Sequence, residues 1–271
     1  MLSIFSYEFM QRAFIAAICI SIIAPCIGVI IVLKRLSAIG DATSHSALAG
    51  IAAGLAFGFD PVLGAIIFSV LAVFSVEGFR KAFGRYADIA PIVVLSTGVG
   101  LTAVFSGFIK GSSANLNSFM FGSIVAVSKS EMYLTIGLSL TVLLMTILLY
   151  RELFYISFDE ESAKLSRVPV KTVNFIFMIM TAITVSVASR IVGALMISSL
   201  MVIPVACAMT VGKSYKMTMI LSVLFAIIFT ITGLFLSYYV RFDFGDLKPG
   251  GTIVLTGVIT LIILLILKRK R

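Results

Sequence analysis

Charge is scarce in this chain. Only 12% of the 271 residues are charged, whereas roughly 25% is typical of soluble domains. The mean hydropathy is +1.16, and 60% of the residues are hydrophobic. This composition excludes a soluble globular protein, and no stretch between the apolar segments is long enough to form a soluble domain. We expect an integral membrane protein with one domain, residues 1–271.

The sequence also lacks the motifs of several enzyme classes. It has no G-x-x-x-x-G-K-[ST] segment for nucleotide phosphates and no H-E-x-x-H segment of zinc proteases. Its cysteines lie in apolar runs, where buried cysteine usually packs as a small hydrophobic side chain; they are Cys19, Cys26 and Cys207. The net charge of +9 does not indicate nucleic-acid binding, because the basic residues fall in short loops between apolar segments.

Long apolar segments are what the sequence does contain. Their lengths predict an all-α polytopic membrane protein with eight or nine transmembrane helices. The segments are residues 12–33, 41–58, 61–79, 91–109, 131–150, 171–189, 191–211, 217–240 and 251–268. The first follows no basic stretch, so we expect a span and not a cleaved signal peptide. Residues 111–127 are too polar to face lipid, which predicts an outer loop or a re-entrant segment buried in protein.

The distribution of lysine and arginine predicts the orientation in the membrane. With nine spans, one set of loops, together with the C-terminal tail, carries fifteen of these residues and the other set carries six. Basic residues are enriched on the cytoplasmic side of membrane proteins. We therefore expect a cytoplasmic C-terminus and an external N-terminus.

The only histidine lies in the sequence Gly-Asp-Ala-Thr-Ser-His, residues 40–45. Asp41 and His45 are four residues apart, so on a helix both side chains project from one face. Ionisable groups inside a bilayer are costly, which makes the pair a functional candidate and a plausible half-site for a divalent cation. The alternatives are that Asp41 caps a helix and that His45 is a hydrogen-bonded packing residue.

Two ligands do not hold a metal ion securely. Zinc in proteins usually takes four ligands, and both His nitrogen and Asp oxygen are acceptable. A two-fold dimer would supply the second pair from another copy of the chain. The position of Asp41 close to Lys34 and Arg35 places it near a helix end, so the pair reaches the membrane interior only if residues 36–44 dip inward.

Three glycines at four-residue intervals follow the histidine. Gly50, Gly54 and Gly58 form a small-residue stripe of the kind that lets two membrane helices approach closely. At about 100° per residue, Gly54 lies opposite His45 on the helix. We expect this helix to pack through its glycine face and to present Asp41 and His45 on the other.

The longest loop on the predicted cytoplasmic side runs from Arg151 to Lys171. Acidic residues precede basic ones here, which suits a short helix, and a proline closes it before the next span. The residues concerned are Asp159, Glu160, Glu161, Lys164, Arg167 and Pro169. The pattern fits either a solvated amphipathic loop or a docking helix for a cytoplasmic partner. Elsewhere, Pro204 predicts a kinked or broken helix, and Asp60 and Glu77 fall at segment ends, where capping or interface exposure is expected.

Several sequence blocks resemble the zinc/manganese permease subunits of bacterial ABC transporters. The blocks are Tyr7 to Ala16, Val32 to Gly50 with its Gly-Asp-x-x-Ser-His motif, Phe121 to Ser128 and Leu200 to Ala206. The resemblance covers almost the whole chain. It implies a fold similar to the vitamin B12 and siderophore permeases and a location in the bacterial cell membrane. It also implies a homodimer served by cytoplasmic ATPase subunits and an extracellular metal-binding protein.

The same resemblance implies roles for individual residues. Asp41 and His45 of each copy would contact the transported metal, and Asp159 to Pro169 would couple the permease to the ATPase. The N-terminal block looks closest to zinc members, whereas the Gly-Asp-Ala wording is shared with manganese members. We expect a permease that imports Zn²⁺, with Mn²⁺ or iron as the alternative, that has no permanently bound cofactor and is not itself an enzyme. An intramembrane enzyme or a structural scaffold that uses the pair differently are the rival classes.

Overall fold

The computed structural model describes residues 8–109, 114–122, 127–242 and 245–269. Within them, nine helices have 18 or more residues: α1 Glu8–Leu33, α2 Ala38–Phe57, α3 Pro61–Phe83, α4 Ile89–Ser106, α6 Lys129–Leu148, α9 Val170–Ala188, α10 Ala194–Val211, α11 Tyr215–Tyr239 and α12 Pro249–Arg269. The shorter elements are η2 Gly84–Tyr86, α5 Ala114–Phe121, α7 Tyr150–Phe158, α8 Glu160–Leu165, the π-helical turn η3 Ser189–Gly193, and the strands β1 Arg241–Phe242 and β2 Gly245–Asp246. Lys110, residues 123–126 of the block from Phe121 to Ser128 and the last two residues of the basic tail lie outside the described residues.

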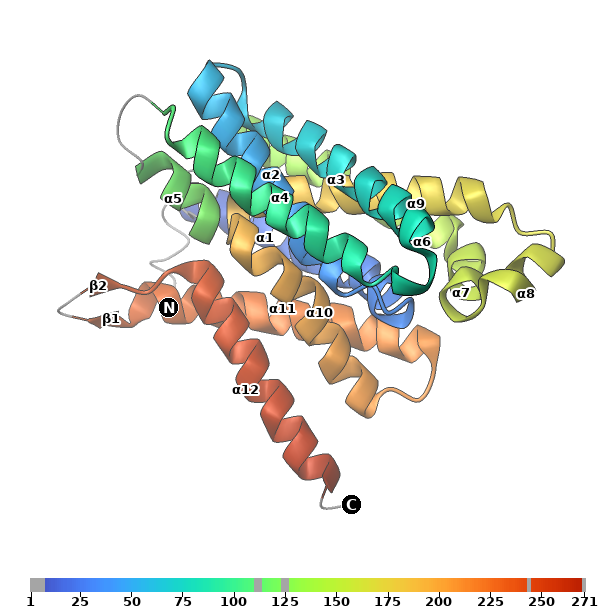
Figure 1. Cartoon of the computed structure of the whole chain (residues 1–271). Coiled ribbons are helices and arrows are strands. Elements are labelled where there is room, and N and C mark those ends of the chain that lie inside the picture. Colours follow the sequence, from blue (N-terminus) through green and yellow to red (C-terminus); the bar gives the residue numbers. More distant parts are fainter. Residues whose placement is uncertain (1–7, 110–113, 123–126, 243–244, 270–271) are drawn as a thin grey trace.

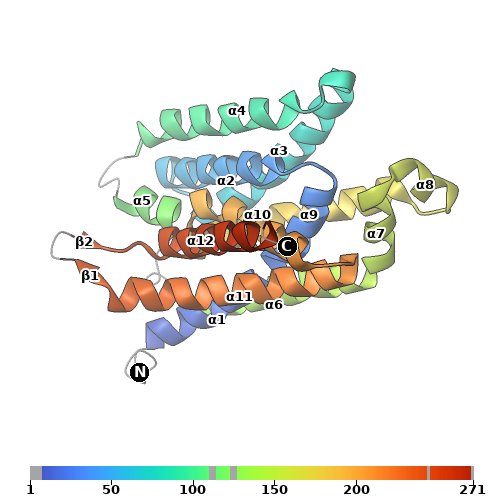
Figure 2. The same cartoon turned by 90° about the horizontal axis from the view of Figure 1, so that it is seen from below.

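The long helices run back and forth between two ends of one bundle (Figures 1 and 2). One end carries α5 and the antiparallel β1–β2 hairpin, and the other carries α7 and α8. We call these the α5 end and the α8 end. Helix α12 begins at the α5 end and diverges from the bundle in Figure 1, although it contacts α10 and α11.

Seven of the long helices are long and apolar enough to cross a membrane. The two that do not meet this measure are α2, which is rich in small and polar residues, and α10, of which only Met196–Val211 counts as a shorter apolar helix. Together they account for all nine predicted segments, with ends shifted by a few residues. The expectation of an all-α membrane protein with eight or nine spans is confirmed.

Helix α2 is modest in hydropathy because protein surrounds it. It contacts α3, α4, α5, α9 and α10, and fourteen of its twenty residues are buried. Buried hydroxyl groups on α2 are satisfied by the helix itself: Thr43 donates to the Ile39 carbonyl at 2.7 Å and Ser44 to that of Asp41 at 3.0 Å. A helix in this position needs small side chains more than lipid-soluble ones, which explains its sequence.

The break predicted at Pro204 lies elsewhere. Helix α10 continues through Pro204 from Ala194 to Val211, although proline cannot donate the usual hydrogen bond to the carbonyl four residues earlier. Gly193, the last residue of the π-helical turn η3, has a φ of +105°. Glycine adopts this backbone conformation readily, but most other residues do not. The discontinuity between α9 and α10 therefore rests on Gly193.

Most of the described part of the polar segment 111–127 forms helix α5, which packs against the bundle. It packs against η3, α10 and α2, and Leu116 belongs to an apolar cluster with Leu48 and Ile51 of α2. At its end, Gly122 has φ +76°, and an added Cβ would lie 2.6 Å from the Val192 carbonyl carbon. Of the two alternatives from the sequence, these contacts favour a segment packed into the bundle.

Candidate metal site and coupling segment

Helix α2 begins three residues before the aspartate of the candidate pair. Its N-cap position is Ser37 and its first residue is Ala38, so Asp41 lies in the first turn and does not cap the helix. The capping alternative for Asp41 is therefore wrong. A tight turn of backbone hydrogen bonds precedes the helix, including Leu36 N–H to the Ile31 carbonyl at 2.8 Å and Ile39 N–H to the Leu36 carbonyl at 2.8 Å.

Asp41 and His45 lie one turn apart on α2, as the spacing predicts. Both are partly buried, in contrast to the fully buried neighbours between them, and the carboxylate is close enough to act electrostatically on the imidazole. Among the described residues, neither side chain has a hydrogen-bond partner. The view of His45 as a hydrogen-bonded packing residue therefore gains no support within the described part of the chain.

Contacts with neighbouring helices place the pair near the middle of the bundle. Gly98, at the midpoint of α4, lies against the backbone of His45 and Ser46: an added Cβ would be 2.9 Å from the His45 carbonyl carbon. A Cβ added to Gly40 would lie 3.6 Å from the Cα of Ser198, the fifth residue of α10. The chain after Lys34 thus dips inward before α2 starts, which brings Asp41 and His45 away from the α8 end.

Two of the three stripe glycines pack as predicted and one does not. An added Cβ on Gly50 would lie 2.1 Å from the Gly64 carbonyl oxygen, and one on Gly54 would lie 2.8 Å from the Cα of Pro61. Both contacts are with α3, on the side of α2 opposite His45. Gly58 instead ends the helix in the left-handed conformation, at φ +78°, with open space around it. Its predicted packing role is corrected to a C-cap.

One copy of the chain supplies an incomplete ligand set. In the described ranges, no group of three or more His, Cys, Asp and Glu residues is placed to hold a metal ion. Asp41 and His45 lie four residues apart on α2, and Cys26 and Cys207 are both buried.

The predicted coupling segment folds into the short helices α7 and α8. Asp159 caps α8, accepting a hydrogen bond from the Glu161 N–H at 3.0 Å, and Lys164 lies in the last turn, paired with Glu161 at 2.7 Å. Hydrogen bonds from the Ser162 side chain and from the Glu161 backbone hold the pKa of Asp159 below its ordinary value. The predicted short helix with acids first and bases last is confirmed.

Helix α8 ends in a Schellman motif built around an arginine. The Val168 N–H donates to the Ala163 carbonyl and the Arg167 N–H to the Lys164 carbonyl, each at 3.1 Å. Arg167 occupies the left-handed position, at φ +61°, and Pro169 follows as the residue that precedes α9. Ala163 is fully buried while Lys164 and Arg167 are exposed, so α8 rests on the bundle with its charged side outward.

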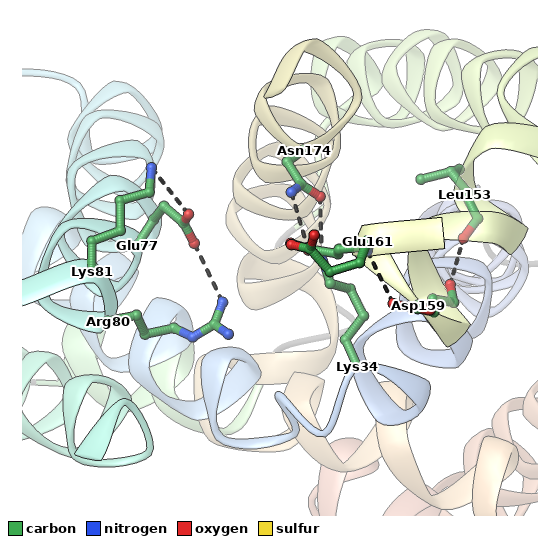
Figure 3. A network of polar contacts seen from close by, with 10 residues as sticks. Lys34, Glu77, Arg80, Lys81, Leu153, Asp159, Glu161 and Asn174 are labelled. Atoms are coloured by element: carbon green, nitrogen blue, oxygen red, sulfur yellow. Dashed lines mark hydrogen bonds and ion pairs between the residues drawn. The ribbon is translucent and has the colours of Figure 1, made fainter. Parts of the chain in front are cut away.

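One side chain of α8 turns inward. Lys34, at the end of α1, donates to Glu160 Oε1 at 2.7 Å and to Asn174 Oδ1 of α9 at 3.0 Å (Figure 3). Burial alone would raise the pKa of Glu160, but the hydrogen bond from Lys34 and its positive charge outweigh burial and hold that pKa below its ordinary value. The sequence reasoning missed Lys34 and Asn174, because nothing in their spacing links them to Glu160.

Comparison with known proteins decides the class. The model of the ABC 3 transport family matches residues 6–268. The chain belongs to the ABC 3 transport family. It is therefore a membrane permease subunit of an ABC transporter for metal ions, a transport component and not an enzyme. The intramembrane enzyme, the rival class from the sequence, is thereby excluded.

Two curated members of the ABC 3 transport family are similar over most of their length. The manganese import system permease protein ScaB of Streptococcus parasanguinis is 33% identical over 257 residues, 95% of this chain and 90% of ScaB. The manganese transport system membrane protein MntC of Halalkalibacterium halodurans is 29% identical over 251 residues, 92% of this chain and 84% of MntC. Both names specify manganese, so these relatives give the zinc expectation no specific support.

A solved structure shares the fold. PsaBC from Streptococcus pneumoniae in complex with Fab contains a chain that superimposes with a TM-score of 0.84 at 30% identity, over 96% of this chain and 92% of that one. The architecture of this family member is therefore that of an ABC metal permease along nearly its whole length.

Proposed function

We propose that this chain is the permease of an ABC importer for Mn²⁺ and that Asp41 and His45 of two copies bind the ion during transport. The observation that carries the proposal is the pair itself: two ligand side chains, one helical turn apart, at mid-depth in the bundle and without hydrogen-bond partners in the described residues. Unpaired ionisable groups at that depth are costly unless they serve the substrate.

The ligand count supports a dimeric site. Each copy contributes one carboxylate and one imidazole, and two copies related by a two-fold axis would give an Asp₂His₂ set. The glycine face of α2 is occupied by α3, whereas the side chains of Asp41 and His45 on the other side are only partly buried and keep some surface for an ion. A four-ligand site shared between subunits can open by a small change in their separation, which suits transient binding.

Manganese is favoured over zinc by the names of the relatives. ScaB and MntC are both named for manganese. Carboxylate oxygens and water suit Mn²⁺, whereas imidazole is shared with Zn²⁺, so a mixed set admits either ion and does not exclude zinc on chemical grounds. Zn²⁺ is therefore the competing ion in every uptake experiment below.

The partners follow from the class of transporter. We infer that cytoplasmic ATPase subunits dock on α8, that an extracellular metal-binding protein delivers the ion at the α5 end, and that the C-terminus is cytoplasmic. The concentration of basic residues supports this orientation, since Arg80, Lys81 and Lys164 all lie toward the α8 end. The surrounding lipid is that of the bacterial cell membrane.

The test is metal uptake in cells that lack this gene, complemented with wild type or variants, with radioactive Mn²⁺ and Zn²⁺ side by side. Asp41→Ala and His45→Ala are each expected to reduce Mn²⁺ uptake at least tenfold, since even changes to residues that only orient a metal ligand commonly cost about 10–100-fold in metal affinity. Thr43→Val is the matched control, because Thr43 is fully buried on the same two turns of α2 and bonds only its own helix in the described structure.

Membrane abundance of each variant is measured on the same cells. Normal uptake of both metals by Asp41→Ala and His45→Ala would return the pair to a packing role. Loss of Zn²⁺ uptake with Mn²⁺ uptake unchanged would assign zinc as the substrate and leave the site in place.

A further inference from the structure

Three separate elements meet at the ammonium group of Lys34. It extends from the end of α1 to Glu160 of α8 and Asn174 of α9, and the Asn174 amide also donates to Glu160 Oε1 at 3.3 Å (Figure 3). The Lys34 side chain is only 10% exposed, so its charge lies largely out of water. A buried charge of this kind depends on its partner and holds that partner in place.

The other charged contacts nearby have a different character. Glu161 and Lys164 pair within α8 and are 81% and 56% exposed. Glu77, which is 23% exposed, pairs within α3 with Arg80 and Lys81, which are 30% and 76% exposed (Figure 3). All these pairs lie within one helix, and an exposed pair such as Glu161–Lys164 contributes little to stability. The Lys34–Glu160 pair instead joins residues that are 126 positions apart in the sequence. It therefore connects two elements that are not adjacent in the chain.

Lys34 is also firmly connected to the start of α2. After Lys34 the backbone passes through the hydrogen-bonded turn described above, in which Leu36 and Ile39 are both 8% exposed. Asp41 follows two residues after Ile39. A turn that is hydrogen-bonded and anchored in the core transmits a displacement better than a flexible loop, since packed interiors are stiff.

We propose that the Lys34–Glu160 pair is the link through which movement of α8 displaces the start of α2 and so the Asp41–His45 pair. This inference rests on the proposed function. Lys34 and Glu160 are positioning residues. They do not touch the metal, and their action is to make α2 follow the movement of α8, the helix on which the ATPase subunits dock. Asn174 keeps the pair aligned from α9.

The first experiment measures the number of Mn²⁺ ions transported per ATP hydrolysed by the whole transporter, permease with its ATPase subunits and metal-binding protein, in proteoliposomes. The variants are Lys34→Met and Glu160→Gln, and Glu161→Gln is the matched control on the exposed side of α8. We expect ATP hydrolysis to stay within about twofold, while transport per ATP falls about tenfold, as for the loss of a typical coupling between sites. The charge exchange Lys34→Glu with Glu160→Lys is expected to recover part of the ratio.

A merely structural pair would give another result. Transport and ATP hydrolysis would then fall together, with ATPase subunits lost from the purified complex, and the charge exchange would change nothing in the ratio. Unchanged transport per ATP in Lys34→Met would equally overturn the proposal.

A second readout does not depend on transport of any metal. In a variant that carries His45→Cys together with Cys19→Ala, Cys26→Ala and Cys207→Ala, the introduced thiol is alkylated with and without nucleotide trapped on the ATPase. The alkylation rate is expected to change at least threefold on trapping when Lys34 is present and to stay constant in Lys34→Met. A response that survives in Lys34→Met, or a parent without any response, would refute the link. A wild-type transporter that moves no metal, together with a Lys34-dependent response in the His45→Cys variant, would instead refute the proposed function alone.

Discussion

A glycine on a neighbouring helix packs directly against the backbone of the candidate metal site. Gly98 of α4 lies against α2 where His45 and Ser46 are joined, and an added Cβ would be 2.8 Å from the Ser46 nitrogen and 2.9 Å from the His45 carbonyl carbon. The substitution Gly98→Ala therefore adds one methyl group directly behind the proposed ligand without altering either ligand side chain.

The size of the displacement follows from these distances. Ordinary van der Waals contact begins at 3.4 Å, so the 2.8 Å distance must grow by about 0.6 Å, and backbone atoms on both sides leave no flexible side chain to absorb it. Overpacking of this kind costs about 1–3 kcal/mol. A misplacement approaching 1 Å at a site can cost about 10²-fold in rate, so we expect Mn²⁺ uptake to fall about tenfold in Gly98→Ala.

Gly100 provides the control on the same helix. An added Cβ at Gly100 meets nothing within 4 Å, so Gly100→Ala gains helix propensity of about 1 kcal/mol without a contact. The assay is initial uptake of radioactive Mn²⁺ at equal membrane abundance, with thermal unfolding of both purified variants. Equal uptake by the two alanine variants would show that α2 does not need its present position against α4, and the geometric reasoning about the site would fail.

Three further predictions concern the α8 end and the start of α3. Arg167 has a φ of +61°, and Arg167→Gly removes a left-handed strain of roughly 1 kcal/mol. The midpoint temperature of thermal unfolding should therefore be higher for Arg167→Gly than for Arg167→Ala, and equal midpoints would contradict this. Because the folded-state pKa of Glu160 is depressed, the folded protein binds fewer protons than the unfolded one; its contribution to stability is complete above pH 4.5 and is lost as the pH falls below that value. Acid titration of Glu160→Gln, monitored by circular dichroism, should lack this component, and an unchanged acid profile would speak against it. Asp60 accepts hydrogen bonds from Val62 N–H at 2.7 Å and Leu63 N–H at 3.3 Å, so Asp60→Ala should cost about 1 kcal/mol while Asp60→Asn costs little, and similar unfolding midpoints for the two would rule out the cap.

Much of the architecture could be predicted because each membrane helix is specified by a continuous apolar segment of the sequence. The nine long helices match the nine apolar segments, and the charge order from Asp159 to Lys164 gives the short helix α8. The Asp41 and His45 pair could be predicted to share a helix face, since that follows from a four-residue spacing alone. The end-capping role of Asp60 likewise follows from its place directly before Pro61.

What could not be predicted depends on contacts between distant segments. The depth of Asp41 is set by Gly40 against Ser198 and by Gly98 against Ser46, and such contacts leave no periodic signal in one sequence. Gly58 continues the four-residue interval, yet the helix ends there, so it caps α2 and packs against nothing. The Lys34–Glu160 pair was missed for the same reason, because 126 residues separate its members.

The glycine contacts at the α5 end have a consequence for the order of assembly. Gly122 meets the backbone of Ile191 and Val192, and an added Cβ on Gly250 would lie 2.4 Å from the Val192 oxygen and 3.0 Å from the Phe121 oxygen. During synthesis, α5 leaves the ribosome long before η3, and η3 long before the start of α12. The packing around α5 begins with α2, η3 and α10 and is complete only when the start of α12 is in place. The bundle that surrounds α2 is therefore completed at this end only when translation of the chain is nearly over.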